Sequence, residues 1–161
     1  MVSGEEASFN YFQDDVEGPA VEFLDAGAEP GDLDFICAYD AVAFGGNRAA
    51  TIRQYFAQPD RAIFIADDGH VIAGYAVASG NRVGPLLAQT PGAAAALLDA
   101  ACETLDTPTI RMAVPEENSS ALALVAQRGW KPVGRNAHMA RGTTTHVPRR
   151  HIYGLMSLGE G

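Results

Sequence analysis

Apolar positions along the chain recur with two periods, and these periods divide it into strands and helices. Short apolar runs that end at turn residues predict strands, as at residues 62–66, which stop before an Asp-Asp-Gly turn. Apolar side chains three or four positions apart predict helices, as at Leu97, Leu98 and Ala101. The predicted strands are residues 21–24, 62–66, 71–78, 82–88, 109–114, 132–141 and 152–158.

Cap residues indicate where the predicted helices begin. Asp32, Asn47, Thr90 and Asn118 each precede an apolar face of helical spacing, and their side chains are types that accept hydrogen bonds from first-turn amides. Glycine or proline follows most of these faces and ends the helix. The resulting order is β-α-α-β-β-β-α-β-α-β-β. It predicts an α/β architecture, more closely an α+β mixed sheet, with helices on both faces.

The length of 161 residues suits one domain. Residues 1–20 are acidic with little periodicity, so we interpret them as a tail or linker before a domain at residues 21–161. Phe9, Tyr11 and Phe12 break this pattern, and they suggest docking on the domain or on a partner. The sequence has no apolar run of membrane-spanning length, and its N-terminus lacks the apolar segment of a secretory signal. We therefore expect a cytoplasmic protein that does not enter a membrane.

The net charge of −9 is unevenly distributed, since residues 1–47 hold eleven acids and no Lys or Arg. Residues 128–151 hold six Lys or Arg and no acid, which suggests either a solvated surface or a site for an anionic ligand. An acidic chain is a poor general nucleic-acid binder, so that role is not expected. Cys37 and Cys102 suit buried reduced side chains, and no ligand set for a metal is evident.

One spacing in the C-terminal half resembles a known family. Asn118, Ala121 and Gly129-Trp130 follow the predicted strand at 109–114. This succession of strand, Asn cap, helix and Gly-aromatic exit is similar to the GNAT superfamily of acyl-CoA-dependent N-acetyltransferases. The resemblance covers about residues 20–161 and implies a GNAT-like fold. Segments around Asp40, Phe44-Gly45, Asn47-Arg48, Gly84-Pro85-Leu86 and Met139 to Gly142 look most like the second half of tandem-GNAT proteins.

The resemblance implies acetyl-CoA or another acyl-CoA as cofactor. In relatives, the strand corresponding to residues 82–88 splays from its neighbour and binds the pantetheine arm, and amides at the next helix start bind the pyrophosphate. Here Pro91 removes one such amide, so a capped, Ala-rich packing helix is the alternative. The implied cofactor-binding residues are Leu86, Leu87, Ala88, Gln89, Gly92, Ala93, Ala94 and Asn118.

Acyl transfer to an amine needs a base for the ammonium and an acid for the leaving thiolate. Relatives often place a tyrosine where this chain has Val125, so the usual acid is missing. The candidate catalytic residues are Glu116, Tyr75 and His138, and Glu117 is an alternative base. Each also has a structural interpretation: solvated turn carboxylates, a core tyrosine and an exposed strand histidine.

Three functions remain open from the sequence. The first is an acyl-CoA-dependent N-acyltransferase acting on a small-molecule or protein amine, with a small-molecule substrate as partner and an anionic one as an option. The second is a degenerate GNAT-fold binding or structural module without CoA turnover, working as a homodimer or with a partner GNAT domain. The third is an enzyme that uses the same cleft for chemistry other than acyl transfer.

Overall fold

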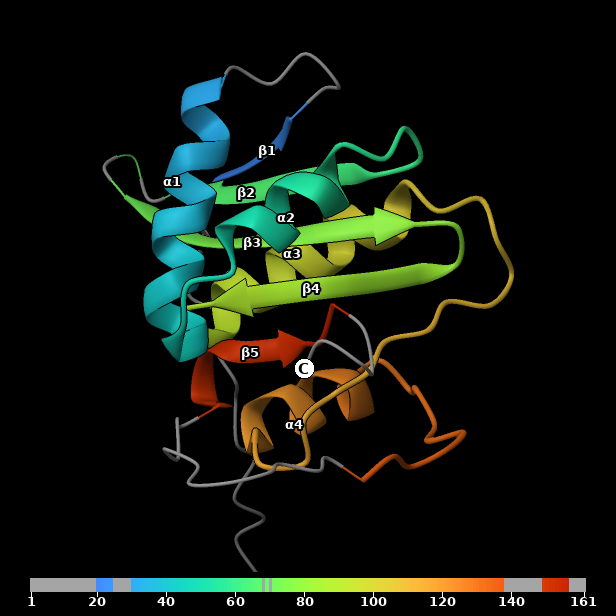
Figure 1. The fold of residues 1–161 in the computed structure, drawn as a ribbon. Coiled ribbons are helices and arrows are strands. Elements are labelled where there is room, and N and C mark those ends of the chain that lie inside the picture. Colours follow the sequence, from blue (N-terminus) through green and yellow to red (C-terminus); the bar gives the residue numbers. More distant parts are fainter. Residues whose placement is uncertain (1–19, 25–29, 68, 70, 138–148, 157–161) are drawn as a thin grey trace, which may run out of the picture.

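The computed structural model describes residues 20–24, 30–67, 69, 71–137 and 149–156. Five strands form one sheet in the order β1-β2-β3-β4-β5, and every neighbouring pair is antiparallel (Figure 1). The first four strands follow the chain as a meander, whereas β5 comes from the C-terminal end and extends the sheet beyond β4. The strands are β1 Ala20–Leu24, β2 Ala62–Asp67, β3 Ile72–Ser79, β4 Arg82–Ala88 and β5 Ile152–Gly154.

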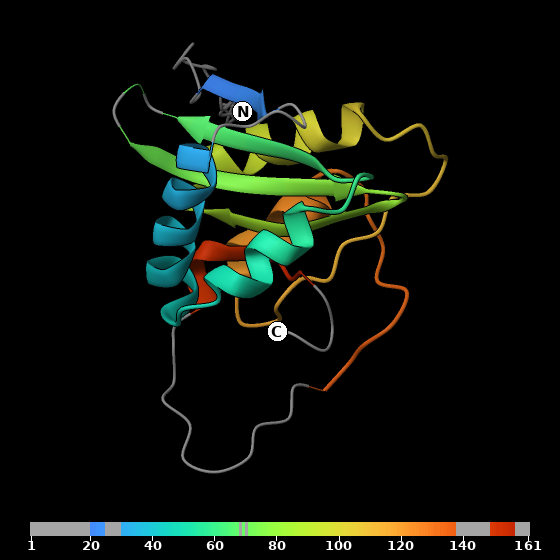
Figure 2. The same ribbon diagram turned by 45° about the horizontal axis from the view of Figure 1, so that its top comes forward.

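Helices cover both faces of this sheet. In Figure 2, α1 and α2 lie over one face and α3 lies over the other. The first helix continues without a break into a π-helical turn, η1, and a short 3-10 turn, η2, precedes β5. The bounds are α1 Pro30–Asp40, η1 Ala41–Gly45, α2 Ala49–Phe56, α3 Pro91–Glu103, α4 Ser119–Gln127 and η2 Arg149–His151.

Two of the four predicted caps, Thr90 and Asn118, are confirmed, whereas the N-cap position of α2 is Arg48 and Asn47 lies one residue before it. The side chains of Thr90 and Asn118 accept hydrogen bonds from the amides of Ala93 and Ala121, at 3.1 and 3.0 Å. The Asn47 side chain accepts from the Ala49 amide at 3.1 Å. The prediction for Asp32 is wrong, because α1 already begins at Pro30, a residue whose fixed φ and missing amide suit a first helical position.

Alternation along the strands produces two apolar layers. Phe64, Ala66, Ala76 and Ala78 face a cluster with α3 and α4. Their neighbours in sequence face a second cluster with α1, η1 and α2: Ile63, Ile65, Tyr75 and Val77. Both layers are buried, so β2, β3 and β4 are the shared centre of the molecule.

The predicted mixed sheet is wrong in one respect. Residues 109–114 do not form a strand but make an isolated parallel bridge, from Arg111 to Arg82. A strand needs a partner along its length, and only the first residues of β4 lie beside residues 109–114. Residues 132–137 have no regular structure either, and the rest of that predicted strand, 138–141, lies outside the described residues.

Candidate functional site

A wedge opens between β4 and the segment that follows α3. At its narrow end the Val83 amide donates to the Arg111 carbonyl at 2.9 Å, and the Arg111 amide donates to the Asn81 carbonyl at 2.8 Å. Beyond this point β4 pairs with β5 instead, at Leu86 and Leu87. We call the space between β4 and residues 111–113 the wedge. Two parallel segments that separate in this way leave backbone groups of β4 available to another strand-like partner.

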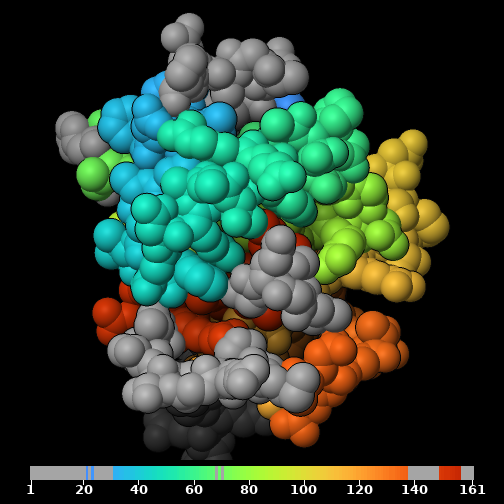
Figure 3. All heavy atoms as spheres, in the orientation of Figure 1, coloured from blue at the N-terminus to red at the C-terminus, as the bar shows by residue number. Residues whose placement is uncertain are grey.

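The chain's own C-terminal segment fills the wedge. Residues 152–155, called here the insert, pair with β4 through Gly154 opposite Leu86 and Ile152 opposite Leu87. On the other side, the Leu155 amide donates to the Ala113 carbonyl at 2.8 Å. Figure 1 shows β5 between β4 and α4, and in Figure 3 the red atoms of residues 149–156 lie against the lower edge of the blue-green η1 region.

Two glycines let the insert approach closely. A Cβ atom on Gly84 would lie only 2.3 Å from the Leu155 carbonyl oxygen, and Gly84 has a φ of +149° that side chains rarely adopt. A Cβ on Gly154 would lie 3.0 Å from the Met112 sulfur and 3.3 Å from the Leu86 Cβ. The backbone contact between β4 and the insert therefore depends on glycine at position 84, whereas a side chain at position 154 would require Met112 and Leu86 to shift slightly.

Asn118 holds the start of the insert. Its Nδ2 donates to the carbonyl oxygens of Arg149, Arg150 and Ile152, at 3.2, 3.1 and 2.8 Å. Its Oδ1 caps α4, and the residue is only 3% exposed. Asn118 thus joins the N-terminus of α4 to the backbone that leads into β5. In the described structure, the protein itself uses both polar atoms of this side chain.

The start of α3 has few free donors. Thr90 accepts the Ala93 amide on its hydroxyl and the Ala94 amide on its carbonyl, at 3.1 and 3.0 Å. Pro91 has no amide hydrogen. Gly92, the next residue, is exposed, and its amide is a first-turn donor that takes no part in these two bonds.

The other predicted cofactor-binding residues lie along the same edge. Leu86, Leu87 and Ala88 are fully buried, and the Ala88 carbonyl contacts His151 Nδ1 at 3.2 Å. Gln89 is exposed, and its backbone amide donates to Ala73 at 2.8 Å. An acyl-CoA arm does not fit this edge while the insert is in place, because the same backbone would have to bind both.

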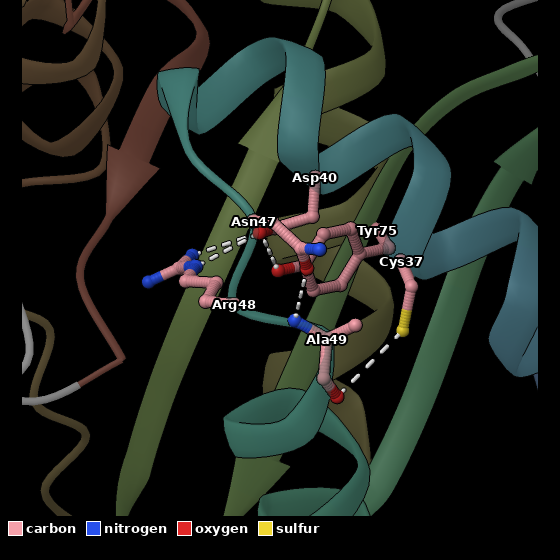
Figure 4. Close-up of polar contacts among 6 residues, drawn as sticks. All are labelled: Cys37, Asp40, Asn47, Arg48, Ala49 and Tyr75. Carbon is pink, nitrogen blue, oxygen red and sulfur yellow. Dashed lines mark hydrogen bonds and ion pairs between the residues drawn. The ribbon is translucent and has the colours of Figure 1, made fainter.

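Tyr75 lies away from this edge, in a buried polar cluster (Figure 4). Its hydroxyl donates to Asp40 Oδ2 at 2.6 Å, and Arg48 donates two hydrogen bonds of 2.8 Å to the same carboxylate. The Arg48 guanidinium also stacks over the Phe44 ring at 3.8 Å. Burial raises the pKa of Tyr75 well above its usual value, and the negative Asp40 raises it further. The phenol therefore stays protonated and serves α1 and η1 rather than the wedge.

The remaining catalytic candidates are not brought to Tyr75. Glu116 is exposed and forms an ion pair with Arg135 at 2.6 Å, with side chains 66% and 81% exposed. Glu117 is exposed as well, and His138 lies outside the described residues. The structure thus leaves Glu116 at the surface just before α4, while Tyr75 is enclosed beneath α1.

The sequence indicated a strand at residues 152–158, which the structure has as β5 at Ile152–Gly154, but not its pairing with β4 in the wedge or the residues that lead into it. Tyr153 is buried in the wedge; burial raises its pKa, and a hydrogen bond with Ser120 partly offsets this. Arg150 donates to His151 Nε2 at 3.0 Å, which places a basic pair beside the end of β4. Gly84 and Gly154 were the available signal, since each is a glycine in a predicted strand.

A family model described as "Acetyltransferase (GNAT) domain" matches residues 36–154. The chain belongs to this GNAT acetyltransferase family. The match begins in α1 and ends at β5, so it includes the wedge together with α3 and α4. No protein with a curated description matches the chain.

Solved structures have the same fold as this GNAT domain. A putative acetyltransferase from Pyrococcus horikoshii matches with a TM-score of 0.66 and 19% identity, over 92% of this chain and 48% of that one. The domain therefore spans about half of that protein. An aminoglycoside acetyltransferase, HMB0005, from an uncultured soil metagenomic sample matches with a TM-score of 0.54 and 16% identity, over 78% and 98% of the two chains. A second soil-metagenome aminoglycoside acetyltransferase, meta-AAC0020, is in complex with sisomicin. It matches with a TM-score of 0.50 and 15% identity, over 79% and 96% of the chains.

Two further kinds of site were sought in the described part of the GNAT domain. None of its helices has the length and apolarity that crossing a membrane requires. Among the same residues, no three His, Cys, Asp or Glu side chains gather in a way that would hold a metal ion.

Proposed function

We propose that this GNAT domain is an acyl-CoA-dependent N-acyltransferase, with acetyl-CoA or another acyl-CoA as donor and an amine as acceptor. The observation that carries the proposal is the wedge. Its narrow end is fixed by the bonds of Arg111 to Asn81 and Val83, and beyond this end β4 pairs with the insert, which shows that its edge accepts a strand-like partner. A pantetheine arm has amide groups that suit such an edge, in the manner of an added strand.

In this proposal the residues along the wedge keep the roles that the family resemblance gives them, except Asn118, whose polar atoms bind α4 and the backbone of residues 149–152. The backbone of residues 86–88 binds the arm once the insert has left, and the amide of Gly92 faces the phosphates. Glu116 is the proposed base because, unlike Tyr75, it is exposed and able to exchange protons with solvent. The form described here is then an inactive one.

The acceptor we propose is a small-molecule amine, with a protein amine as the alternative. One structural neighbour is an aminoglycoside acetyltransferase in complex with sisomicin, which supports a small molecule. The match to only 48% of the Pyrococcus horikoshii protein supports a partner GNAT domain or a second copy of this chain.

A second candidate is a GNAT-fold module that does not turn over acyl-CoA. The insert itself favours this candidate, since it fills the wedge with buried side chains, including Ile152 and Tyr153. The Thr90 cap at α3 and the absence of a tyrosine at Val125 support it too.

Ligand-dependent unfolding separates the two candidates. We expect CoA at 100 times its dissociation constant to stabilise the protein by about 2.7 kcal/mol, measured as a rise in melting temperature. ATP serves as the matched control for nonspecific anion binding and should produce a smaller rise. Acetyl-CoA mixed with a panel of amines, an aminoglycoside among them, should release free thiol. No rise at millimolar CoA, together with no thiol release, would reject the transferase and leave the module.

A further inference from the structure

We infer that the insert is a releasable strand that takes the place of the cofactor arm, and that Asn118 is the residue that keeps it there. This inference rests on the proposed function for its consequence, but not for its geometry. It assigns Asn118 a positioning role: its Nδ2 binds the carbonyl oxygens of Arg149, Arg150 and Ile152, within 3.2 Å.

Few backbone bonds hold the insert by comparison with the rest of the sheet. Strands β2 and β3 pair over six residue positions, whereas β5 pairs with β4 at two and shows an irregularity between Leu86 and Leu87. Beyond this short ladder, the Leu155 amide makes the bond to Ala113.

Among the described residues, contacts of Tyr153 with Ser120 and of His151 with the Ala88 carbonyl also attach this segment. The three carbonyl contacts of Asn118 add an attachment that depends on one side-chain amide.

The insert and an acyl-CoA arm exclude each other. Both need the backbone of Leu86 and Leu87, and Gly84 leaves no room for anything between β4 and the Leu155 carbonyl. Apparent affinity for CoA is then the affinity of the open form reduced by the fraction of molecules that are open. Any change that raises the open fraction should strengthen CoA binding by the same factor.

Burial of the insert's side chains keeps the closed form dominant. Tyr153 contributes to the cluster beneath α3 and α4, while Ile152 belongs to the cluster beneath α1 and α2. Opening therefore exposes apolar surface from both layers, which makes it rare. The hydrogen bonds of Asn118 can be removed without removing these apolar side chains. Their loss therefore shifts the equilibrium between the closed and open forms while the core stays intact.

Substitution of Asn118 by Asp tests this inference. Aspartate keeps the oxygen that caps α4, because Asp and Asn are equally good caps, but it has no hydrogen to donate to the three carbonyls. Hydrogen exchange of the full chain at pH 8 is measured on peptides covering residues 149–156 and 119–127. We expect protection of residues 149–156 to fall about tenfold or more, the effect of one strong hydrogen bond, while α4 stays protected.

Two further variants serve as controls. Asn118→Ser also keeps a capping oxygen and loses the amide without adding charge, so it should loosen residues 149–156 in the same direction. Thr90→Ala removes the cap of α3 but touches no atom of the insert, so it should leave exchange of residues 149–156 unchanged relative to global stability.

CoA affinity of the wild-type protein and of Asn118→Asp, measured by calorimetry, completes the test. A tighter apparent Kd in the variant, by the factor seen in exchange, supports both the inference and the proposed function. Faster exchange of residues 149–156 with no CoA binding to either protein supports the releasable insert and rejects the transferase. Unchanged protection of residues 149–156 in Asn118→Asp would overturn the inference.

Discussion

At the scale of single residues, Asp40 shows how one buried carboxylate joins two helices to the sheet. It is fully buried at the end of α1, and it receives hydrogen bonds from Arg48 before α2 and from Tyr75 on β3. Burial is the largest single influence on the pKa of Arg48 and lowers it, but the hydrogen bond to Asp40 and the interactions with Tyr75 and the Asp40 charge together raise it. The charged pair is thus compensated within the protein, and each partner depends on the other.

Replacing Asp40 by Asn should therefore be costly. The change leaves the Arg48 guanidinium without its counter-charge in a site where its side chain is 11% exposed, and we expect a loss of about 3–5 kcal/mol in the free energy of unfolding. Asp99 provides a matched control, since it also binds an arginine, Arg128, through several short contacts but is 59% exposed. Asp99→Asn should cost less than about 1 kcal/mol. Equal losses for the two variants in urea titrations would contradict this account of Asp40.

The same residues show what the sequence could indicate about the candidate site. Asp40, Phe44 and Arg48 were noticeable as a family-like spacing, but nothing local placed Tyr75, 35 residues from Asp40, against them. A strand tyrosine is compatible with a cleft or with a core, and only the helix packed over that face decides between them. The environment of Tyr75 is determined by residues far from it in sequence. Hydrophobic periodicity along the chain does not indicate such contacts.

At the scale of elements, local patterns were sufficient where each element has its partner nearby. The meander β2-β3-β4 was predictable because its strands alternate and are joined by short turns. The start of α4 was predictable because Asn118 acts through its own first turn. The strand expected at residues 109–114 was not formed, because the wedge separates it from β4, and neither the wedge nor the pairing of the insert with β4 has a local signal beyond Gly84 and Gly154.

Substitution of Gly84 tests whether the insert packs directly against β4. An alanine there would place its Cβ against the Leu155 carbonyl and adopt an unfavourable φ, so we expect a loss of about 2–5 kcal/mol from strain and overpacking. Gly92→Ala is the matched control, since the added Cβ would lie 4.0 Å from the Thr90 hydroxyl oxygen and alanine favours helix. This control should leave stability unchanged or raise it by up to about 1 kcal/mol.

Thermal unfolding and near-ultraviolet circular dichroism measure both glycine variants. A Gly84→Ala protein as stable as the wild type would mean that Leu155 does not lie against β4, and the insert would then be misplaced.

At the scale of the whole molecule, one sheet is shared by two apolar layers. Leu97 on α3 is fully buried in one cluster, and Ile36 on α1 is fully buried in the other. No cluster contact joins these two residues, because β2, β3 and β4 lie between the layers. The layers nevertheless unfold as one unit if the shared strands are the cooperative centre of the domain.

This arrangement predicts that substitutions in the two layers lower the free energy of unfolding independently, while the domain still unfolds in one transition. Ile36→Val should cost about 0.5–1.5 kcal/mol and Leu97→Ala about 2–5 kcal/mol. Because the two sites lie on opposite faces, the double variant should lose the sum within about 0.5 kcal/mol. Ile36→Val with Ile52→Val is the matched comparison: both residues belong to the cluster beneath α1 and α2, so their costs are free to deviate from the sum. Urea unfolding followed by two probes, far-ultraviolet circular dichroism and Trp130 fluorescence, measures these costs. Two separate unfolding transitions would show that the sheet does not hold the two layers together. Strands β2, β3 and β4 belong to both layers, so unfolding of one layer should unfold the other.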